Sequence, residues 1–203
     1  MQKLMFNDNY GLTQAVMELR KTMTRRIIPL TDTDKTYLDT AFDWDLREKV
    51  IIDRYAKYKV GEVVAVAQCY EDAILDVGEE KWNKIHKWYN INYLCHEKGL
   101  HNKMFVRADL MPHQIRITDI KIERLQDISE EDCLREGIQE YFPYIDRDPN
   151  DKVRTFRYFK HGKIRHCISP ASKCFAYLID DISGKGTWES NPYVFAYSFK
   201  FIK

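Results

Sequence analysis

Apolar positions recur with helical spacing near both ends of the chain. From Leu12 to Leu19 they are spaced i, i+3, i+4 and i+7, which predicts an amphipathic helix over residues 10–20. Ser169-Pro170 is a favourable helix start and Gly184 a favourable stop, so a second helix is expected between them. A third, short helix is expected over residues 129–136, where serine is followed by three acids.

Three other segments have the patterns of strands. Residues 63–70 form a nearly continuous apolar run after a glycine turn, which is typical of a buried strand. Isoleucines alternate over residues 115–122 with one slip in phase at Asp119, which predicts a β-bulge. Aromatic residues occupy every second position over residues 193–201, and we expect most of these rings to lie in the core. Strands and helices in this order predict an α+β domain built on a curled sheet or small barrel.

Composition narrows the class of protein. Hydrophobic residues make up 44% of the 203 residues and charged residues 31%, which excludes a largely disordered chain and suits one domain over 1–203. No run of 18 apolar residues occurs, so no membrane partner is expected. The N-terminus lacks a basic segment followed by an apolar one, so we expect a cytoplasmic protein whose five cysteines are reduced.

Motifs for metals and common cofactors are absent from the sequence. The closest groupings, Cys95-His96 with His101 and His161 with His166-Cys167, lack the spacing of a zinc site. There is no P-loop, no G-x-G-x-x-G and no G-x-S-x-G motif. We therefore expect neither a metal nor a cofactor.

Two basic stretches are candidates for binding nucleic acid, although Lys and Arg (32) nearly balance Asp and Glu (31) over the whole chain. Residues 151–167 hold six basic residues and one acid, interleaved with aromatic rings, a combination that suits phosphates and bases. The alternative is a solvated hairpin around His161-Gly162, neutralised by the acidic residues 127–146. In the second stretch, residues 20–26, four of seven residues are basic, and the alternative is a solvated helix end. The candidate nucleic-acid ligands are Arg20, Arg25, Arg26, Arg154, Arg157 and Lys160.

The order Arg20-Lys21-Thr22-x-Thr24-x-Arg26 after an amphipathic helix resembles the signature of the ASCH domain family. A Lys-x-Gly-Glu turn precedes the apolar run at 63–70, and the 115–125 strand leads into an acidic helix start, as in that family. Trp188-x-x-Asn191-Pro192 before the last strand is similar to larger ASCH proteins of bacteria and their phages. One departure is Leu19, where family members usually have glycine to ease the exit from the helix.

This resemblance implies a PUA-like small β-barrel with peripheral helices, and insertions at residues 31–58, 71–101 and 139–166. It also implies two functions. The family is generally regarded as RNA-binding, which would make RNA or a modified nucleoside the partner. Small bacterial members are amidohydrolases that remove the acyl group from N4-acetylcytidine with a Lys, a Thr and a Glu.

Carried over by motif, the Lys and Thr of that reaction fall on Lys21 and Thr24, and the Glu falls on Glu136. Amide hydrolysis needs a nucleophile, a base and an acid, and a desolvated lysine can serve as a base. The alternative interpretation is that Lys21 only binds phosphate or solvent, and that Glu136 only forms an ion pair at a helix end. Binding without chemistry, hydrolysis, and protein interaction remain three open classes of function.

Overall fold

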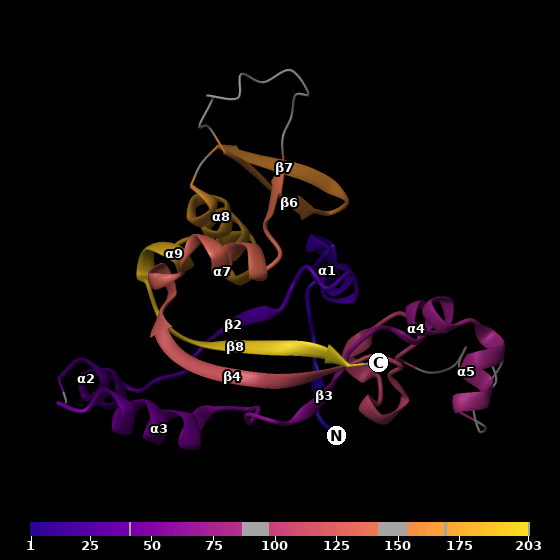
Figure 1. Cartoon of the computed structure of the whole chain (residues 1–203), viewed down its shortest axis with the longest axis horizontal. Coiled ribbons are helices and arrows are strands. Elements are labelled where there is room, and N and C mark those ends of the chain that lie inside the picture. Colours follow the sequence, from indigo (N-terminus) through magenta and orange to yellow (C-terminus); the bar gives the residue numbers. More distant parts are fainter. Residues whose placement is uncertain (41, 87–97, 142–153, 169, 203) are drawn as a thin grey trace.

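The computed structural model describes residues 1–40, 42–86, 98–141, 154–168 and 170–202. They form an α+β structure with a five-stranded mixed sheet, order β1-β3-β4-β8-β2, and a three-stranded antiparallel sheet, order β5-β6-β7 (Figure 1). The strands are β1 (Lys3–Leu4), β2 (Met23–Ile27), β3 (Val63–Val66), β4 (Gln114–Arg124), β5 (Gln139–Tyr141), β6 (Thr155–Lys160), β7 (Lys163–Ile168) and β8 (Tyr193–Ile202). The helices are α1 (Leu12–Met17), α2 (Asp32–Thr40), α3 (Trp44–Tyr55), α4 (Tyr70–Val77), α5 (Glu79–Ile85), α7 (Glu130–Arg135), α8 (Ala171–Ser183) and α9 (Thr187–Ser190).

The α+β prediction is confirmed, whereas the prediction of a closed barrel is wrong for the part of the chain that is described. Strands β1 and β2 lie at opposite edges of the larger sheet and do not pair with each other. Strand β1 has only two residues and pairs in parallel with β3, so it is too short to bring the two edges together. The sheet is therefore curled but open.

Strands β4 and β8 form the middle of this sheet, and both match their predicted patterns. Their register shifts between Ile117 and Asp119, which confirms the predicted bulge. The alternating rings of β8 lie in the core as predicted: Phe195, Tyr197 and Phe199 are at most 3% exposed. The buried side chains of these two strands form part of the main hydrophobic core.

The end of α1 and the start of α4 differ from the sequence prediction for local reasons. Helix α1 is shorter than the predicted 10–20 segment, because Leu19 adopts a left-handed conformation with φ 61° and ends the helical path. The predicted strand at 63–70 stops at Val66, because Cys69 caps the N-terminus of α4. Ser169, the predicted start of α8, lies outside the described residues.

The three predicted insertions each build elements outside the five-stranded sheet. Residues 31–58 contain α2 and α3, residues 71–101 contain α5 and most of α4, and residues 139–166 contain β5, β6 and most of β7. In Figure 1, α7, α8 and α9 lie between the larger sheet and the β6–β7 hairpin, while α4 and α5 lie at the far end of the sheet. Their status as additions to a smaller family fold stays a prediction.

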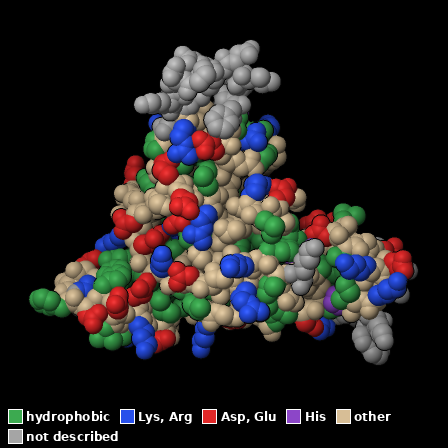
Figure 2. Space-filling model, viewed as in Figure 1, with side chains coloured by type: hydrophobic (Ala, Val, Ile, Leu, Met, Phe, Trp, Pro, Cys, Tyr) green, Lys and Arg blue, Asp and Glu red, His purple; other side chains and the backbone are tan. Residues whose placement is uncertain are grey.

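Charged side chains of both signs are interspersed over the face shown in Figure 2. None of the helices in the described part of the chain has the length and apolar character needed to cross a membrane.

Candidate functional site

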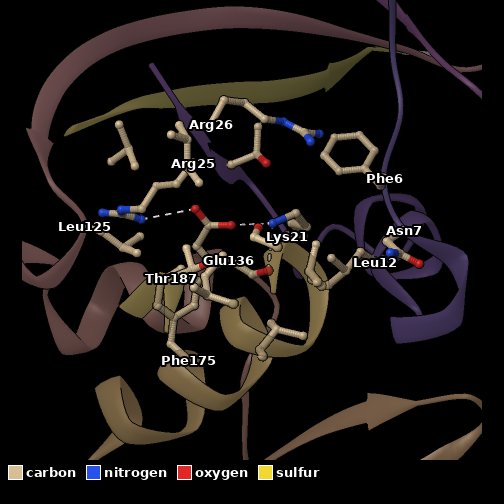
Figure 3. A pocket seen from close by; sticks show the side chains of 17 residues that line it. Phe6, Asn7, Leu12, Lys21, Arg25, Arg26, Leu125, Glu136, Phe175 and Thr187 are labelled. Carbon is tan, nitrogen blue, oxygen red and sulfur yellow. Dashed lines mark hydrogen bonds and ion pairs between the residues drawn. The ribbon is translucent and has the colours of Figure 1, made fainter. Parts of the chain in front are cut away.

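A buried ion pair joins Lys21, which follows α1, to Glu136, which follows α7. The Lys21 Nζ donates to Glu136 Oε2 at 2.6 Å and to the Glu136 main-chain oxygen at 2.7 Å (Figure 3). The two side chains are only 1% and 6% exposed. Two of the three residues carried over as catalytic therefore meet, although 115 positions separate them in the sequence.

Local structure around α7 explains how Glu136 reaches this position. Ser129 caps α7 by accepting a hydrogen bond from the main-chain N–H of Asp132. Gly137 then takes φ 107°, a left-handed value that suits glycine, and turns the chain directly after Glu136. A Cβ on Gly137 would lie 3.3 Å from Leu12 Cδ2, so the tight packing against α1 also favours glycine.

Arg25 completes the buried charge network. Its Nη1 donates to Glu136 Oε1 at 3.2 Å, its Nε to Glu123 Oε1 at 2.7 Å and its Nη2 to Asp132 Oδ2 at 3.1 Å. The Arg25 side chain is 1% exposed. Arg25, one of the candidate nucleic-acid ligands, is thus engaged with three carboxylates and holds Glu136 from the side opposite Lys21.

Lys21, Glu136 and Thr24 line one cavity of about 280 Å³. Its polar wall is formed by Lys21, Thr24 and Glu136 together with Arg25 and Arg26. Its apolar wall comes mainly from α8, through Phe175, Leu178, Ile179 and Ile182. No described residue of the segments 71–101 and 139–166 contributes to the lining. The cavity is therefore enclosed by α8 rather than by either predicted insertion.

The cavity follows the open edge of β2, which explains how adjacent residues of a strand can line it. Side chains of Thr24 and Arg25 point to opposite faces of the sheet, yet both reach the cavity because β2 has no neighbour on its outer side among the described strands. Phe199 N–H donates to the oxygen of Thr22, and Ile28 N–H donates to the oxygen of Tyr193. The alternating ladder therefore turns the main-chain N–H and C=O of Arg25 away from β8, towards the open edge.

Thr24 presents a free hydroxyl at this edge. The residue is 5% exposed, and its Oγ1 forms no hydrogen bond with any residue that the structure describes. Because Thr24 lines the cavity, this hydroxyl is available to a ligand or to water there. Lys21 and Thr24 therefore reach the same cavity at the edge of a strand.

Burial also changes the proton affinity of Lys21. Loss of solvent lowers the pKa of the Lys21 ammonium from its usual value, and the carboxylate of Glu136 opposes this shift. Burial thus favours the neutral amine of Lys21, while the hydrogen bond and charge of Glu136 favour its ammonium form.

Arg20 and Arg26, the other two candidates of the first basic stretch, have different surroundings. Arg20 pairs with Glu18 through its Nε at 2.6 Å, near the end of α1. Arg26 is exposed at the mouth of the cavity, where its Nη2 donates to the main-chain oxygen of Met5 at 2.6 Å. Only Arg26 of these two lines the cavity, so it is the candidate best placed to meet an anionic ligand.

The second basic stretch forms the predicted hairpin, with β6 and β7 joined at His161-Gly162. Three of its cations have local partners: Arg154 binds Glu140 at 2.7 Å, Arg157 binds the side-chain oxygen of Gln139 at 2.9 Å, and Lys160 binds Asp181 at 2.5 Å. None of the three lines the Lys21–Glu136 cavity. A role of this hairpin in nucleic-acid binding stays a prediction, separate from the cavity.

Three parts of the site were not anticipated from the sequence. The apolar wall formed by α8 could not be predicted, because the apolar residues of this helix have the spacing of any core helix. The partners of Arg25 could not be predicted, because Glu123 and Asp132 come from a strand and a helix start with no shared motif. The ring of Phe6, whose centre lies 5.8 Å from Lys21 Nζ, likewise had no signal.

Among the described residues, no group of three or more His, Cys, Asp or Glu side chains could hold a metal ion. Cys95 and His96, from the first grouping considered, lie outside the described residues, and His101 pairs with Glu71 at 2.9 Å. Comparisons of this chain with protein-family models, with curated proteins and with solved structures find no significant match.

Proposed function

We propose that this protein binds a nucleoside with a modified base, of the N4-acylated cytidine type, in the cavity lined by Lys21, Thr24 and Glu136, and that it is a PUA-like protein of the ASCH type. One observation carries the proposal. Three residues selected by motif order line one cavity, and Lys21 Nζ lies 2.6 Å from Glu136 Oε2. RNA that contains such a nucleoside is the corresponding macromolecular ligand.

The composition of the two walls supports a planar base as the ligand. The apolar α8 wall, with the ring of Phe175, suits the flat face of a base, while the polar wall suits its edge. The open edge of β2 adds main-chain donors and acceptors, which are the groups that hydrogen-bond to the edges of bases. A cavity of about 280 Å³ suits one base or nucleoside, not a folded RNA.

A purely structural role does not explain why the Lys21–Glu136 ion pair lies at the wall of a cavity. Burying an ammonium and a carboxylate carries a large desolvation cost, and apolar residues of similar volume commonly replace such pairs without loss of stability. Lys21, Arg25 and Glu136 instead keep their charges at the wall of a cavity. Charged groups retained in such a place are candidates for a binding or catalytic role.

A second candidate function, hydrolysis of the exocyclic amide, is favoured by the free hydroxyl of Thr24 beside the Lys21–Glu136 hydrogen bond. Transfer of one proton from Nζ to Oε2 makes a neutral amine and a carboxylic acid, the base and the acid that the reaction needs. Oγ1 of Thr24 then attacks the acyl carbon and its proton passes to Lys21, while the C–N bond breaks and the departing nitrogen takes the proton of Glu136. A second transfer of a proton from Nζ to Oε2 restores the base and the acid. Lys21 then takes a proton from a water that attacks the acyl-threonine ester, Glu136 returns a proton to Oγ1 as the ester bond breaks, and the carboxylic acid is released.

The test is calorimetric titration with N4-acetylcytidine and cytidine, combined with chromatographic detection of cytidine and acetate. We expect the parent to bind N4-acetylcytidine and Thr24→Val to bind it with at most a modest loss. Lys21→Ala should lose both binding and any turnover, and Lys49→Ala, on an exposed position of α3, should match the parent. Failure of the folded parent to bind the nucleoside contradicts the proposal. If the parent, Thr24→Val and Lys49→Ala all bind the nucleoside but none releases cytidine or acetate, the first function stands and the second is rejected.

A further inference from the structure

A second cavity shares a wall with the first. Its volume is about 260 Å³, and its aromatic lining comes from Tyr55, Tyr58 and Tyr197. Arg26 and Ile27 line both cavities. Two enclosed spaces of similar size therefore meet at one point on β2.

The pairing of β2 with β8 shows how the two spaces are related. Thr24 lies opposite Tyr197 and Arg26 lies opposite Phe195, so these four side chains share one face of the sheet. The second cavity lies on that face, next to Tyr197 and Phe195. The first cavity passes around the open edge of β2 to the other face, where Arg25 meets Glu136, so a ligand reaching into both would cross this edge at Arg26.

Two cations, Arg26 and Lys57, line the second cavity near this junction. Neither Arg26 nor Lys57 forms an ion pair with a carboxylate of the described residues, and no described Asp or Glu lines the second cavity. Lys57 is exposed, with its Nζ 5.4 Å from the centre of the Tyr58 ring. Lys3 differs, because its Nζ is bound by the main-chain oxygens of Met104 and Val106, at 2.6 and 2.7 Å. Arg26 uses only its Nη2, on the main-chain oxygen of Met5, and its Nε and Nη1 have no partner among the described residues.

We infer that the second cavity holds the nucleotide adjacent to the modified nucleoside, so that the ligand is a single-stranded nucleic acid with its connecting phosphate at Arg26. This inference rests on the proposed function. Aromatic walls next to unpaired cations suit a base and its phosphate, since bases stack on rings and guanidinium groups bind phosphate oxygens. A free nucleoside would leave both Arg26 and Lys57 without a counter-charge.

The test compares four ligands: N4-acetylcytidine, its 5′-monophosphate, and the two dinucleotides that join it to adenosine in either order. We expect at least one dinucleotide to bind about tenfold more tightly than the nucleoside, as one stacked base and one phosphate contact provide. Arg26→Ala should reduce this gain and make the log-log salt slope shallower by about 0.7, the value for one phosphate on a single strand. Lys57→Gln should also reduce the ratio of dinucleotide to nucleoside affinity, whereas Lys49→Gln, a matched exposed lysine on α3, should keep it.

The outcomes separate this inference from the proposed function. If the nucleoside binds and neither dinucleotide binds more tightly, the second cavity is not a nucleotide subsite, while the proposed function stands. If a dinucleotide gains affinity but Arg26→Ala and Lys57→Gln leave the ratio unchanged, the phosphate lies elsewhere and the inference is wrong. If the nucleoside does not bind to the folded protein, the proposed function fails and this inference fails with it.

Discussion

Leu19 adopts a backbone conformation that is rare for a residue with a branched side chain. Its φ is 61°, and its side chain is 61% exposed, so little packing compensates for the strain. The left-handed turn directs the chain from α1 into Lys21 and β2. The residue that differs from the usual glycine of the ASCH pattern thus occupies the position where glycine is physically favoured.

We expect Leu19→Gly to stabilise the protein. Removing left-handed strain gains about 1–2 kcal/mol, and the added freedom of glycine in the unfolded chain costs about 0.5–1 kcal/mol, so a net gain near 0.5–1 kcal/mol is expected. Urea denaturation measures it, with Leu19→Ala as the control that shortens the side chain and keeps the strain. A loss of stability in Leu19→Gly contradicts this account of the turn.

The buried charges make an asymmetric prediction. Glu136→Gln leaves Lys21 without its carboxylate, and an uncompensated buried charge costs about 3–5 kcal/mol of unfolding free energy. Lys21→Met removes the buried ammonium itself and leaves Glu136 paired with Arg25, so its cost should be clearly smaller. Chemical denaturation of both variants measures the difference, and equal costs contradict the network described here.

Strand β8 is the element on which the larger sheet depends, because β4 and β2 pair with its two sides. Phe199 lies within it, 3% exposed, with its ring centre 5.7 Å from that of Phe6. Phe199→Ala should lower the unfolding free energy by about 3–5 kcal/mol, the usual cost of truncating a core phenylalanine. Thermal denaturation measures this loss, and Lys200→Ala, on the exposed neighbour, is the control. Normal stability with lost nucleoside binding would instead make β8 a recognition surface.

The carboxylate of Asp34 links helices α2 and α3. Asp34 accepts hydrogen bonds from the Thr31 hydroxyl, the Tyr55 hydroxyl and Arg54 Nη1, each at 2.6 Å. The bond from Thr31 and that from Tyr55 lower the pKa of Asp34 from 3.8 to about 2. The charged carboxylate is therefore favoured in the folded state.

This pKa sets the direction of a pH effect. Because the folded pKa lies below the unfolded one, the stabilisation is complete above pH 3.8 and is lost as the pH falls towards about 2. Asp34→Asn should be less stable than the parent at neutral pH and lose less stability over that acid range. Thermal melts at a series of pH values measure both, and parallel curves for the two proteins contradict the assignment.

For the whole molecule, the distribution of charge predicts weak electrostatic binding of nucleic acid. The net charge is +1, and charges of both signs are interspersed on the face shown in Figure 2. Arg154 and Lys160 of the basic hairpin already have carboxylate partners. These two cations of the hairpin can therefore displace counterions from phosphates only if their ion pairs open.

A single-stranded RNA of about ten nucleotides should accordingly bind with a shallow salt dependence. One or two contacted phosphates give a log-log slope of about −0.7 to −1.4. Fluorescence anisotropy over a range of salt concentrations measures it, with Arg154→Gln as the test of the hairpin. A slope near −4, reduced by that substitution, would show that the hairpin binds the strand and that its ion pairs open to do so.

Features that depend on neighbours along the chain could be predicted from the amino-acid sequence. Side-chain periodicity decides which face of a strand is buried, and so the rings of β8 and the bulge at Asp119 were predictable. The start and end of α7 were also predictable, because Ser129 and Gly137 act on the backbone of the helix within one turn. Motif order also selected Lys21, Thr24 and Glu136, although it could not say that they meet.

The tertiary structure alone decided which elements become neighbours. Periodicity is the same for an open sheet and a closed barrel, so the separation of β1 from β2 could not be seen in the sequence. The Arg25 side chain is buried because it pairs with Glu123 and Asp132. The run of basic residues that contains Arg25 does not show whether such carboxylates lie nearby in the folded protein. The cavity exists because α8 packs beside the open edge of β2, a long-range arrangement set by the burial of apolar surface over the whole fold rather than by any local motif.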